Sequence, residues 1–250
     1  MNIRIIVFFV ALFYSQSIFS QIMNIENVRI KNDTTGMDGT VELSFQYIKN
    51  TKELLTTGSK IHLQYKTEKS LYLLLTNYSL AKSGSTEYAD AGSLHLRYNY
   101  KFKPWLTAEI FTQLQYNNSL NISSRWLNGI GPRSKIMHYK SFVLYAAVLY
   151  MYEYEKLKDP EIINKDNRLS AYISFTLKIN DILNFIYTCY YQPKIVDFND
   201  FRIASYADLK VKISKNFYLK ISHFYSFDTN PAATIPKSTH SISNAISYSF

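Results

Sequence analysis

The chain has 250 residues, of which 47% are hydrophobic, 16% aromatic and 19% charged, and its formal net charge is +9. Soluble domains carry about 25% charged residues, so this chain is poor in charge for its length. Its seven Gly and six Pro exclude a collagen-like repeat and a low-complexity disordered chain. Its single cysteine excludes a disulfide framework and any zinc or iron–sulfur site built from cysteines.

The first twenty residues have the three-part pattern of a secretory signal peptide. A positive start ending at Arg4 precedes an apolar run from Ile5 to Tyr14, and small or polar residues follow as far as Ser20. An apolar run of about ten residues is too short to cross a bilayer as a helix. No cysteine follows the run, which excludes a lipoprotein anchor. We expect cleavage after Ser20; a buried N-terminal strand is the alternative.

From residue 40 onward, apolar and polar residues alternate with a period of two, which is typical of strands that have one apolar face. Turn residues such as Lys103-Pro104 and Asn180-Asp181 separate these runs. Many runs exceed the five or six residues that are usual in soluble strands, and they reach the roughly 9–11 residues that a tilted strand needs to cross a membrane. In chain order, we expect strands at 39–50, 57–67, 69–80, 87–102, 105–117, 119–130, 136–156, 166–179, 183–194, 200–214, 216–228 and 238–250.

Two runs break the alternation because they are apolar on both faces. They extend from Leu71 to Leu75 and from Phe142 to Met151. The second could form a buried helix, but its Tyr and Val content and its place among strands favour a strand. We therefore expect the inner face of that strand to be partly apolar.

A soluble β-sandwich also alternates, so other features must separate it from a membrane barrel. The apolar set is large in nearly every strand, and no helical segment is available to cover it. Tyr and Phe gather near the strand ends, where an interfacial aromatic girdle belongs. The chain ends on alternating Ile246, Tyr248 and Phe250, which resembles the signal read by the outer-membrane barrel-insertion machinery. We predict an all-β fold, a closed antiparallel transmembrane β-barrel of about 12 strands, with 10 or 14 as neighbouring counts.

A membrane barrel implies a division of the chain into segments and a cellular location. We expect a signal peptide at 1–20, an N-terminal periplasmic segment at 21–38 and the barrel at 39–250, in the outer membrane of a Gram-negative bacterium. Every backbone amide in a bilayer must be paired, so the sheet must close, and an even strand count puts both chain ends on the periplasmic side. A secreted or periplasmic soluble β-protein is the alternative.

If the apolar set faces lipid, the lumen receives the charged residues of the strands. Buried charges persist only when they are paired, so we expect an Arg/Glu network across the interior. The network is either structural or the wall of a narrow passage for small anions. Its predicted members are Arg97, Glu109, Arg125, Glu153, Arg168 and Arg202. The other residues expected inside are Glu42, Lys60, His62, Lys66, His95, Lys101, Glu155, Lys178, Asp208, Lys210, Lys212 and Lys220.

Residue patterns for catalysis or metal binding are not found. The five histidines lack HxH or HxxxH spacing, so no metal site and no cofactor are predicted. His240 and Ser241 are adjacent and therefore face opposite sides of a strand, which prevents a nucleophile–base pair within that strand. The chain has no GxSxG, P-loop or GxGxxG motif. Cys189 is expected to face lipid as inert packing.

The net positive charge of the chain indicates an anionic partner. Lysines are spread through strands and turns rather than clustered, so we predict no nucleic-acid binding. Outer-membrane lipid, and the phosphates of lipopolysaccharide in particular, are the expected partners of exposed cations. The segment from Asp228 to Lys237 is expected to be a hairpin loop.

The last part of the chain resembles a known family. The segments Tyr225–Pro231, Pro236–Thr239 and Ile246–Phe250 resemble the C-terminal hairpin of the uncharacterised bacterial outer-membrane barrels called domain of unknown function 481, also labelled salt-induced outer-membrane protein. Softer similarities occur at Gly39–Ser44 and Arg97–Tyr100. Where the family often has two prolines, Pro231 is followed here by Ala232. The resemblance implies a barrel without established activity, and it implies no catalytic residues.

Together these observations predict a non-enzymatic outer-membrane barrel that is structural or narrowly permeable and has an ion-paired lumen. A channel or binder for small anions is one alternative. An outer-membrane lipid-modifying enzyme is the other.

Overall fold

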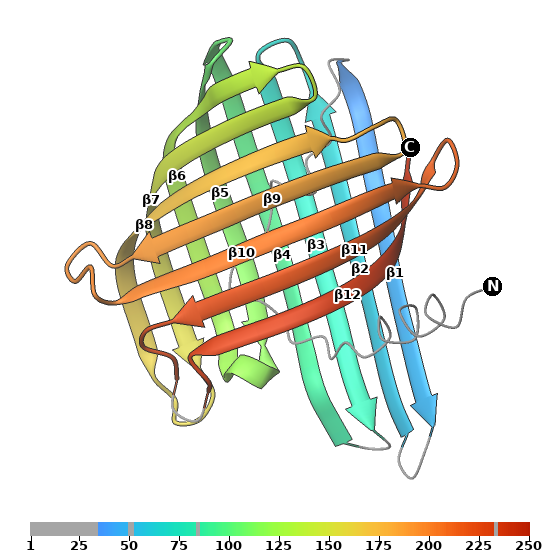
Figure 1. Cartoon of the computed structure of the whole chain (residues 1–250). Helices are drawn as coiled ribbons and strands as arrows, with labels where there is room; N and C mark the ends of the chain where they lie inside the picture. The colour runs from blue at the N-terminus through green and yellow to red at the C-terminus, as the bar shows by residue number, and fades with distance from the viewer. Residues whose placement is uncertain (1–34, 50–52, 84–85, 233–234) are drawn as a thin grey trace.

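Twelve antiparallel strands close into one barrel, in which each strand pairs with its sequence neighbour and β1 pairs with β12 (Figure 1). The computed structural model describes residues 35–49, 53–83, 86–232 and 235–250. The predicted signal peptide lies outside the described residues, as does most of the expected periplasmic segment. The elements are β1 Gly36–Lys49, β2 Glu53–Lys66, β3 Ser70–Ser83, β4 Thr86–Lys103, β5 Leu106–Asn117, η1 Asn118–Leu120, β6 Ile122–Tyr139, β7 Phe142–Leu157, β8 Ile163–Lys178, β9 Leu183–Pro193, β10 Phe201–Lys212, β11 Phe217–Asp228 and β12 Ser238–Ser249. The predicted fold class is confirmed.

One predicted turn is wrong. The sequence suggested that a strand ends at residue 130 and that the next begins at 136, but β6 continues to Tyr139 and the turn is formed by Lys140 and Ser141. Gly131 and Pro132 caused the error because they resemble a turn. The β6–β7 register has no pairs for these two residues, so the missing N–H of the proline costs no ladder hydrogen bond to β7.

Side chains alternate between an exposed apolar outer surface and a buried inner one. Phe45 is 74% exposed and Leu43 is 62% exposed, whereas their neighbours Glu42, Ser44 and Gln46 point to the interior side. The same alternation runs along the other strands, because the side-chain period of a strand is two. It is interrupted at register shifts, such as those between Ile122 and Ser124 and between Lys135 and Met137 of β6. Among the described residues, no helix is long and apolar enough to cross a membrane.

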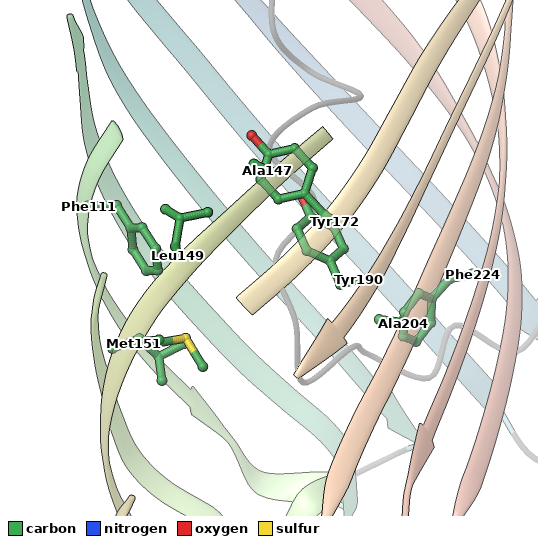
Figure 2. Close-up of a cluster of buried hydrophobic side chains, with 9 residues drawn as sticks. Phe111, Ala147, Leu149, Met151, Tyr172, Tyr190, Ala204 and Phe224 are labelled. Atoms are coloured by element: carbon green, nitrogen blue, oxygen red, sulfur yellow. The ribbon is translucent and has the colours of Figure 1, made fainter. Parts of the chain in front are cut away.

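The interior contains a packed apolar cluster as well as charges. The cluster extends from β5 to β11, and most of its members are labelled in Figure 2. As expected from the apolar run in β7, Ala147, Leu149 and Met151 all point inward, and Leu71, Leu73 and Leu75 on β3 form a second small cluster. The full set in the main cluster is Phe111, Leu127, Ala147, Leu149, Met151, Tyr172, Tyr190, Ala204 and Phe224.

The connections differ between the two ends of the barrel. Turns at one end are as short as Lys140–Ser141, whereas the loop between β11 and β12 spans 229–237 at the other end. Short turns are typical of the periplasmic end of such barrels, and long loops of the extracellular end. Ala232 and Ile235, on either side of the undescribed residues of this loop, pack against Leu120, Ile122 and Leu157 at the same end of the barrel.

The seam where the barrel closes is short. β1 and β2 pair along their whole length, but β1 and β12 pair only from Thr40–Leu43 to Ile246–Ser249. Gly39 and Phe250 extend the seam by exchanging two backbone hydrogen bonds of 3.1 Å. Beyond this stretch the two strands diverge toward the end of the barrel where β1 ends and β12 begins (Figure 1). Closure of the barrel therefore depends on the residues next to the C-terminus.

Candidate functional site

The most concentrated charge cluster surrounds Glu153, on the inner side of β7. Its carboxylate lies 2.6 Å from the nearest nitrogen of Arg202, 3.0 Å from Nε of Arg125 and 3.0 Å from Nε of Arg168. Glu153 and Arg168 are each 1% exposed, and Arg125 is 2% exposed. Since Arg202 is on β10, its side chain reaches β7 past the two intervening strands. One buried carboxylate thus ties together β6, β7, β8 and β10.

Each of these arginines also contacts a second acid. Arg125 donates hydrogen bonds to Glu155, one of them 2.7 Å long. Arg202 Nε donates to Asp228 Oδ2 at 2.8 Å. The guanidinium of Arg168 donates to Asp200 Oδ1 at 3.0 Å. Glu155, Asp228 and Asp200 therefore neutralise the charge of the three arginines that Glu153 alone does not balance.

Asp200 connects this cluster to the loop between β9 and β10. Its carboxylate lies 2.9 Å from Lys194 Nζ, on the other side of the same loop. Burial alone would raise the pKa of Asp200, but the hydrogen bond from Lys194 and the charge of Arg168 outweigh burial and lower the pKa. Burial alone would lower the pKa of Lys194, but its hydrogen bonds to Asp200 and Asp166 outweigh burial and raise the pKa. This ion pair fastens the loop to the barrel rim.

A second, separate cluster is centred on Glu109 of β5. Arg97 Nη1 donates to its carboxylate at 2.9 Å and the hydroxyl of Tyr172 donates at 2.8 Å, from the other side of the interior. Arg133 Nε lies 3.7 Å away, and the guanidinium of Arg133 stacks 3.6 Å above the ring of Tyr145. The two cationic groups and the phenol hold the buried carboxylate in place.

The third cluster lies at the seam. Lys220 of β11 donates to both carboxylate oxygens of Glu42 on β1, at 2.9 and 3.0 Å, and lies 3.3 Å from Asp208. The ion pair passes over β12, where Ala245 and Ser247 occupy the opposing inward positions. These small side chains leave room for Lys220 to reach Glu42. The contact therefore links β1 to β11 at the level where β1 and β12 begin to diverge.

Two lysines beside this third cluster have no carboxylate of their own. Lys60 is opposite Glu42 in the register of β1 and β2, and Lys210 is opposite Lys220 in that of β10 and β11. Within the described part of the chain, neither forms an ion pair. Lys210 Nζ instead lies 5.2 Å from the centre of the Tyr218 ring. This region of the interior therefore carries an excess of positive charge.

The sequence predicted an Arg/Glu network across the interior, and the six predicted residues lie in two of the three clusters. The structure brings together Arg125, Glu153, Arg168 and Arg202, and it places Arg97 with Glu109 in the second cluster. Sequence reasoning missed Arg133, because it lies in the misread turn. It also missed Asp200 and Asp228, which are adjacent to turns and show no distinguishing local pattern.

The predicted C-terminal signal residues point outward at the seam. Phe250 packs its ring against Gly39, where a Cβ would lie 2.3 Å from the ring. Tyr248 packs on Phe217 with ring centres 5.0 Å apart, and Ile246 is opposite Leu43 of β1. The three residues therefore line the short stretch through which the barrel closes.

The remaining residues with chemical potential are dispersed. His223 and His240 face outward, with their rings 6.2 Å apart, and His240 lies 4.7 Å from the ring of Tyr225. Neither hydrogen-bonds to a serine within 35–49, 53–83, 86–232 and 235–250. The same residues contain no group of three or more His, Cys, Asp or Glu that could hold a metal ion. Cys189 is a free, half-buried thiol on the outer face.

Comparison with solved structures shows the same architecture. The NanC porin aligns with a TM-score of 0.51 and 12% identity, covering 86% of this chain and 99% of that chain. The COG4313 outer membrane channel from Pseudomonas putida F1 aligns with a TM-score of 0.54 and 9% identity, covering 92% and 100%. The translocator domain of the autotransporter NalP from Neisseria meningitidis gives 0.52 and 9%, covering 86% and 89%. At these identities the likeness concerns the fold, which is that of bacterial outer-membrane barrels.

None of the curated proteins matches this sequence. A protein-family profile does, over residues 41–250, which is most of the barrel. Its description is protein of unknown function, DUF481, the family that the C-terminal hairpin resembles. The chain therefore belongs to the DUF481 family.

Proposed function

We propose that this protein is a non-enzymatic barrel of the Gram-negative outer membrane whose lumen is closed by ion pairs and is at most narrowly permeable. In this proposal the N-terminal signal peptide is removed, and the C-terminal strand engages the barrel-insertion machinery. The observation that carries the proposal is Glu153, which joins arginines from three other strands across the interior.

The packing of the interior supports a closed lumen. Side chains that line an aqueous pore are exposed to the water inside it. Ala204, Ser174 and Thr188 point inward, but each is 0% exposed, so no water reaches them. The apolar cluster between β5 and β11 leaves a cavity of about 20 Å³ beside Tyr172 and Tyr190, enough for about one water molecule. Twelve strands also enclose less space than the 16–18 strands of aqueous porins.

The charges have a structural role in this proposal. Breaking a buried ion pair leaves an uncompensated charge, which costs about 3–5 kcal/mol. The Glu153 cluster therefore resists separation of β7 from β10. An enzymatic activity has less support, because His223 and His240 face outward and contact aromatic rings rather than a nucleophile.

Solute flux into proteoliposomes tests this proposal. Vesicles containing the refolded barrel should admit arabinose no faster than protein-free vesicles, while a 16-stranded porin in parallel vesicles admits it rapidly. Arabinose entry at a rate comparable to that of the porin would overturn the closed lumen. Protein from the same vesicles must be shown to be folded, by its resistance to unfolding in detergent without heating. Misfolded protein would otherwise be mistaken for a barrel with a closed lumen.

A channel or binder for small anions is the second candidate, and Lys60 and Lys210 favour it. Both face the acids of the third cluster, and neither forms an ion pair in contact with a carboxylate among the described residues. If the barrel conducts anions, Lys210→Glu should shift the ion selectivity of the current from anions toward cations. Charge reversal at Arg97, in the second cluster, should shift the selectivity in the same direction. The closed-lumen proposal predicts no current whose selectivity could change. Exposed cations at the rim would meet lipopolysaccharide phosphates in either case, with no nucleic acid involved.

A further inference from the structure

The outer surface of the barrel is hollowed over β2 to β7. A groove of about 700 Å³ lies there, within the roughly 300–1,000 Å³ that is usual for small-molecule sites. Two neighbouring cross-strand rows of outward side chains form it. The first row runs Leu63, Leu74, Leu96, Thr112, Asn128 and Tyr152; the second contains Tyr72, Tyr98, Ile110, Ile130 and Tyr150.

Two glycines of β6 lie behind this groove, and their Cα hydrogens face the interior of the barrel. A Cβ on Gly131 would lie 2.3 Å from the carbonyl oxygen of Val148, and a Cβ on Gly129 would lie 2.2 Å from the ring of Phe111. At Gly131 the strand thus approaches the backbone of β7 more closely than a residue with a side chain would permit, whereas at Gly129 the inward ring of Phe111 occupies the free space. Glycines within a strand are typical of such bends and close approaches. The Pro132 that follows has no pair on β7, which is consistent with a local bend in the wall at this point.

Two polar side chains lie in this apolar groove. Thr112 and Asn128 are directly opposite each other on β5 and β6, and both are exposed on the outer face. Neither side chain makes a hydrogen bond within the described part of the protein. Hydrocarbon offers no partner for a hydroxyl or a carboxamide, and an unpaired polar group in it is costly. A polar side chain inside the membrane is therefore a functional-site candidate.

We propose that the groove binds a membrane lipid whose acyl chain carries a hydroxyl group. The hydroxyl exchanges hydrogen bonds with Asn128 and Thr112. The hydrocarbon lies along Tyr98, Ile110 and Ile130, with apolar contact on both sides. The ligand comes from the bilayer itself, because the groove opens onto the lipid-facing surface. A molecule that is apolar along its length and polar at one point matches this surface, whereas an ordinary acyl chain leaves both polar groups unpaired.

Tryptophan fluorescence provides the probe. The sequence has two tryptophans, and Trp126 precedes Asn128 by two residues on the same outer face. Trp105 is exposed in the β4–β5 turn, and W105F removes its signal. The W105F protein is placed in vesicles of brominated phosphatidylcholine, which quench Trp126. Tetradecanoic acid and 3-hydroxytetradecanoic acid are then titrated separately, and relief of quenching reports acyl chains that displace the brominated lipid.

The hydroxylated acid should relieve quenching at a mole fraction roughly two- to tenfold lower than the plain acid, as expected for one net hydrogen bond. N128L with T112V should abolish this difference without weakening the response to the plain acid. T76V is the matched control, because Thr76 also faces outward but lies outside the groove, so it should keep the preference.

Equal responses of the W105F protein to the two acids would overturn the proposal. So would a preference that survives in the N128L/T112V variant. A third outcome is that no acid relieves quenching while the protein migrates as a dimer in detergent. That result would assign the groove to contact between two copies of the chain and would also overturn the lipid site.

Discussion

Glu153→Gln is the substitution that tests the interior charges most sharply. The amide keeps the shape of the side chain but removes the negative charge that faces Arg125, Arg168 and Arg202, with nitrogen–oxygen distances of 2.6–3.0 Å. Because Glu153 is 1% exposed, water cannot replace the lost charge. Removing one partner of a buried ion pair costs about 3–5 kcal/mol, so the free energy of unfolding should fall by that amount.

Glu161→Gln provides the matched control. Glu161 also forms an ion pair, with Lys156 at 2.8 Å, but its side chain is 65% exposed, and exposed pairs contribute about 0–1 kcal/mol. Urea unfolding of both variants in lipid vesicles, with the midpoints compared at a common slope, gives the two losses. If E153Q unfolds within about 1 kcal/mol of the wild type, the three arginines do not depend on this carboxylate, and the structural role assigned to it is wrong.

Three further predictions concern the wall, a loop and the seam. Gly131→Ala should cost about 1–3 kcal/mol in urea unfolding, because its Cβ meets backbone atoms of β7, whereas Gly58→Ala meets only the side-chain hydroxyl of Ser44 and should cost less. Asp200 has a lowered pKa, so its ion pair stabilises the β9–β10 loop above about pH 4 and is lost as the pH falls through its folded-state pKa; amide protection factors in that loop, which correct for the intrinsic effect of pH on exchange, should fall over this range in the wild type but not in D200N. Phe250→Ala should reduce assembly into the outer membrane in cells far more than refolding into detergent, and equal losses in both assays would refute a role in insertion.

The strands could be predicted because alternation is a local property. Val41 to Tyr47 show their outward and inward faces in the sequence itself, and the structure keeps that parity. The error at Gly131 and Pro132 has the same local origin, since a bend inside a strand and a turn use the same residue types. Only the pairing with β7 distinguishes the two, and pairing is not a local property.

The interior was harder to predict, because its contacts join strands that are distant in the sequence. Phe111, Tyr172 and Phe224 occupy inward positions, but alternation does not show whether inward aromatic residues meet one another or line a pore. The contact between Glu153 and Arg202 depends on the width of the closed barrel and on the reach of two long side chains. The sequence alone indicated that Glu153 and Arg202 face the interior, and the shape of the barrel decided that they contact each other.

Single-channel conductance of the refolded mature protein in a planar bilayer tests the closed, ion-paired lumen most directly. The account predicts a folded barrel without steady porin-sized current steps. Long-lived steps of that size in the wild-type protein would contradict it, because the Glu153 cluster and the apolar cluster could not then both remain in place.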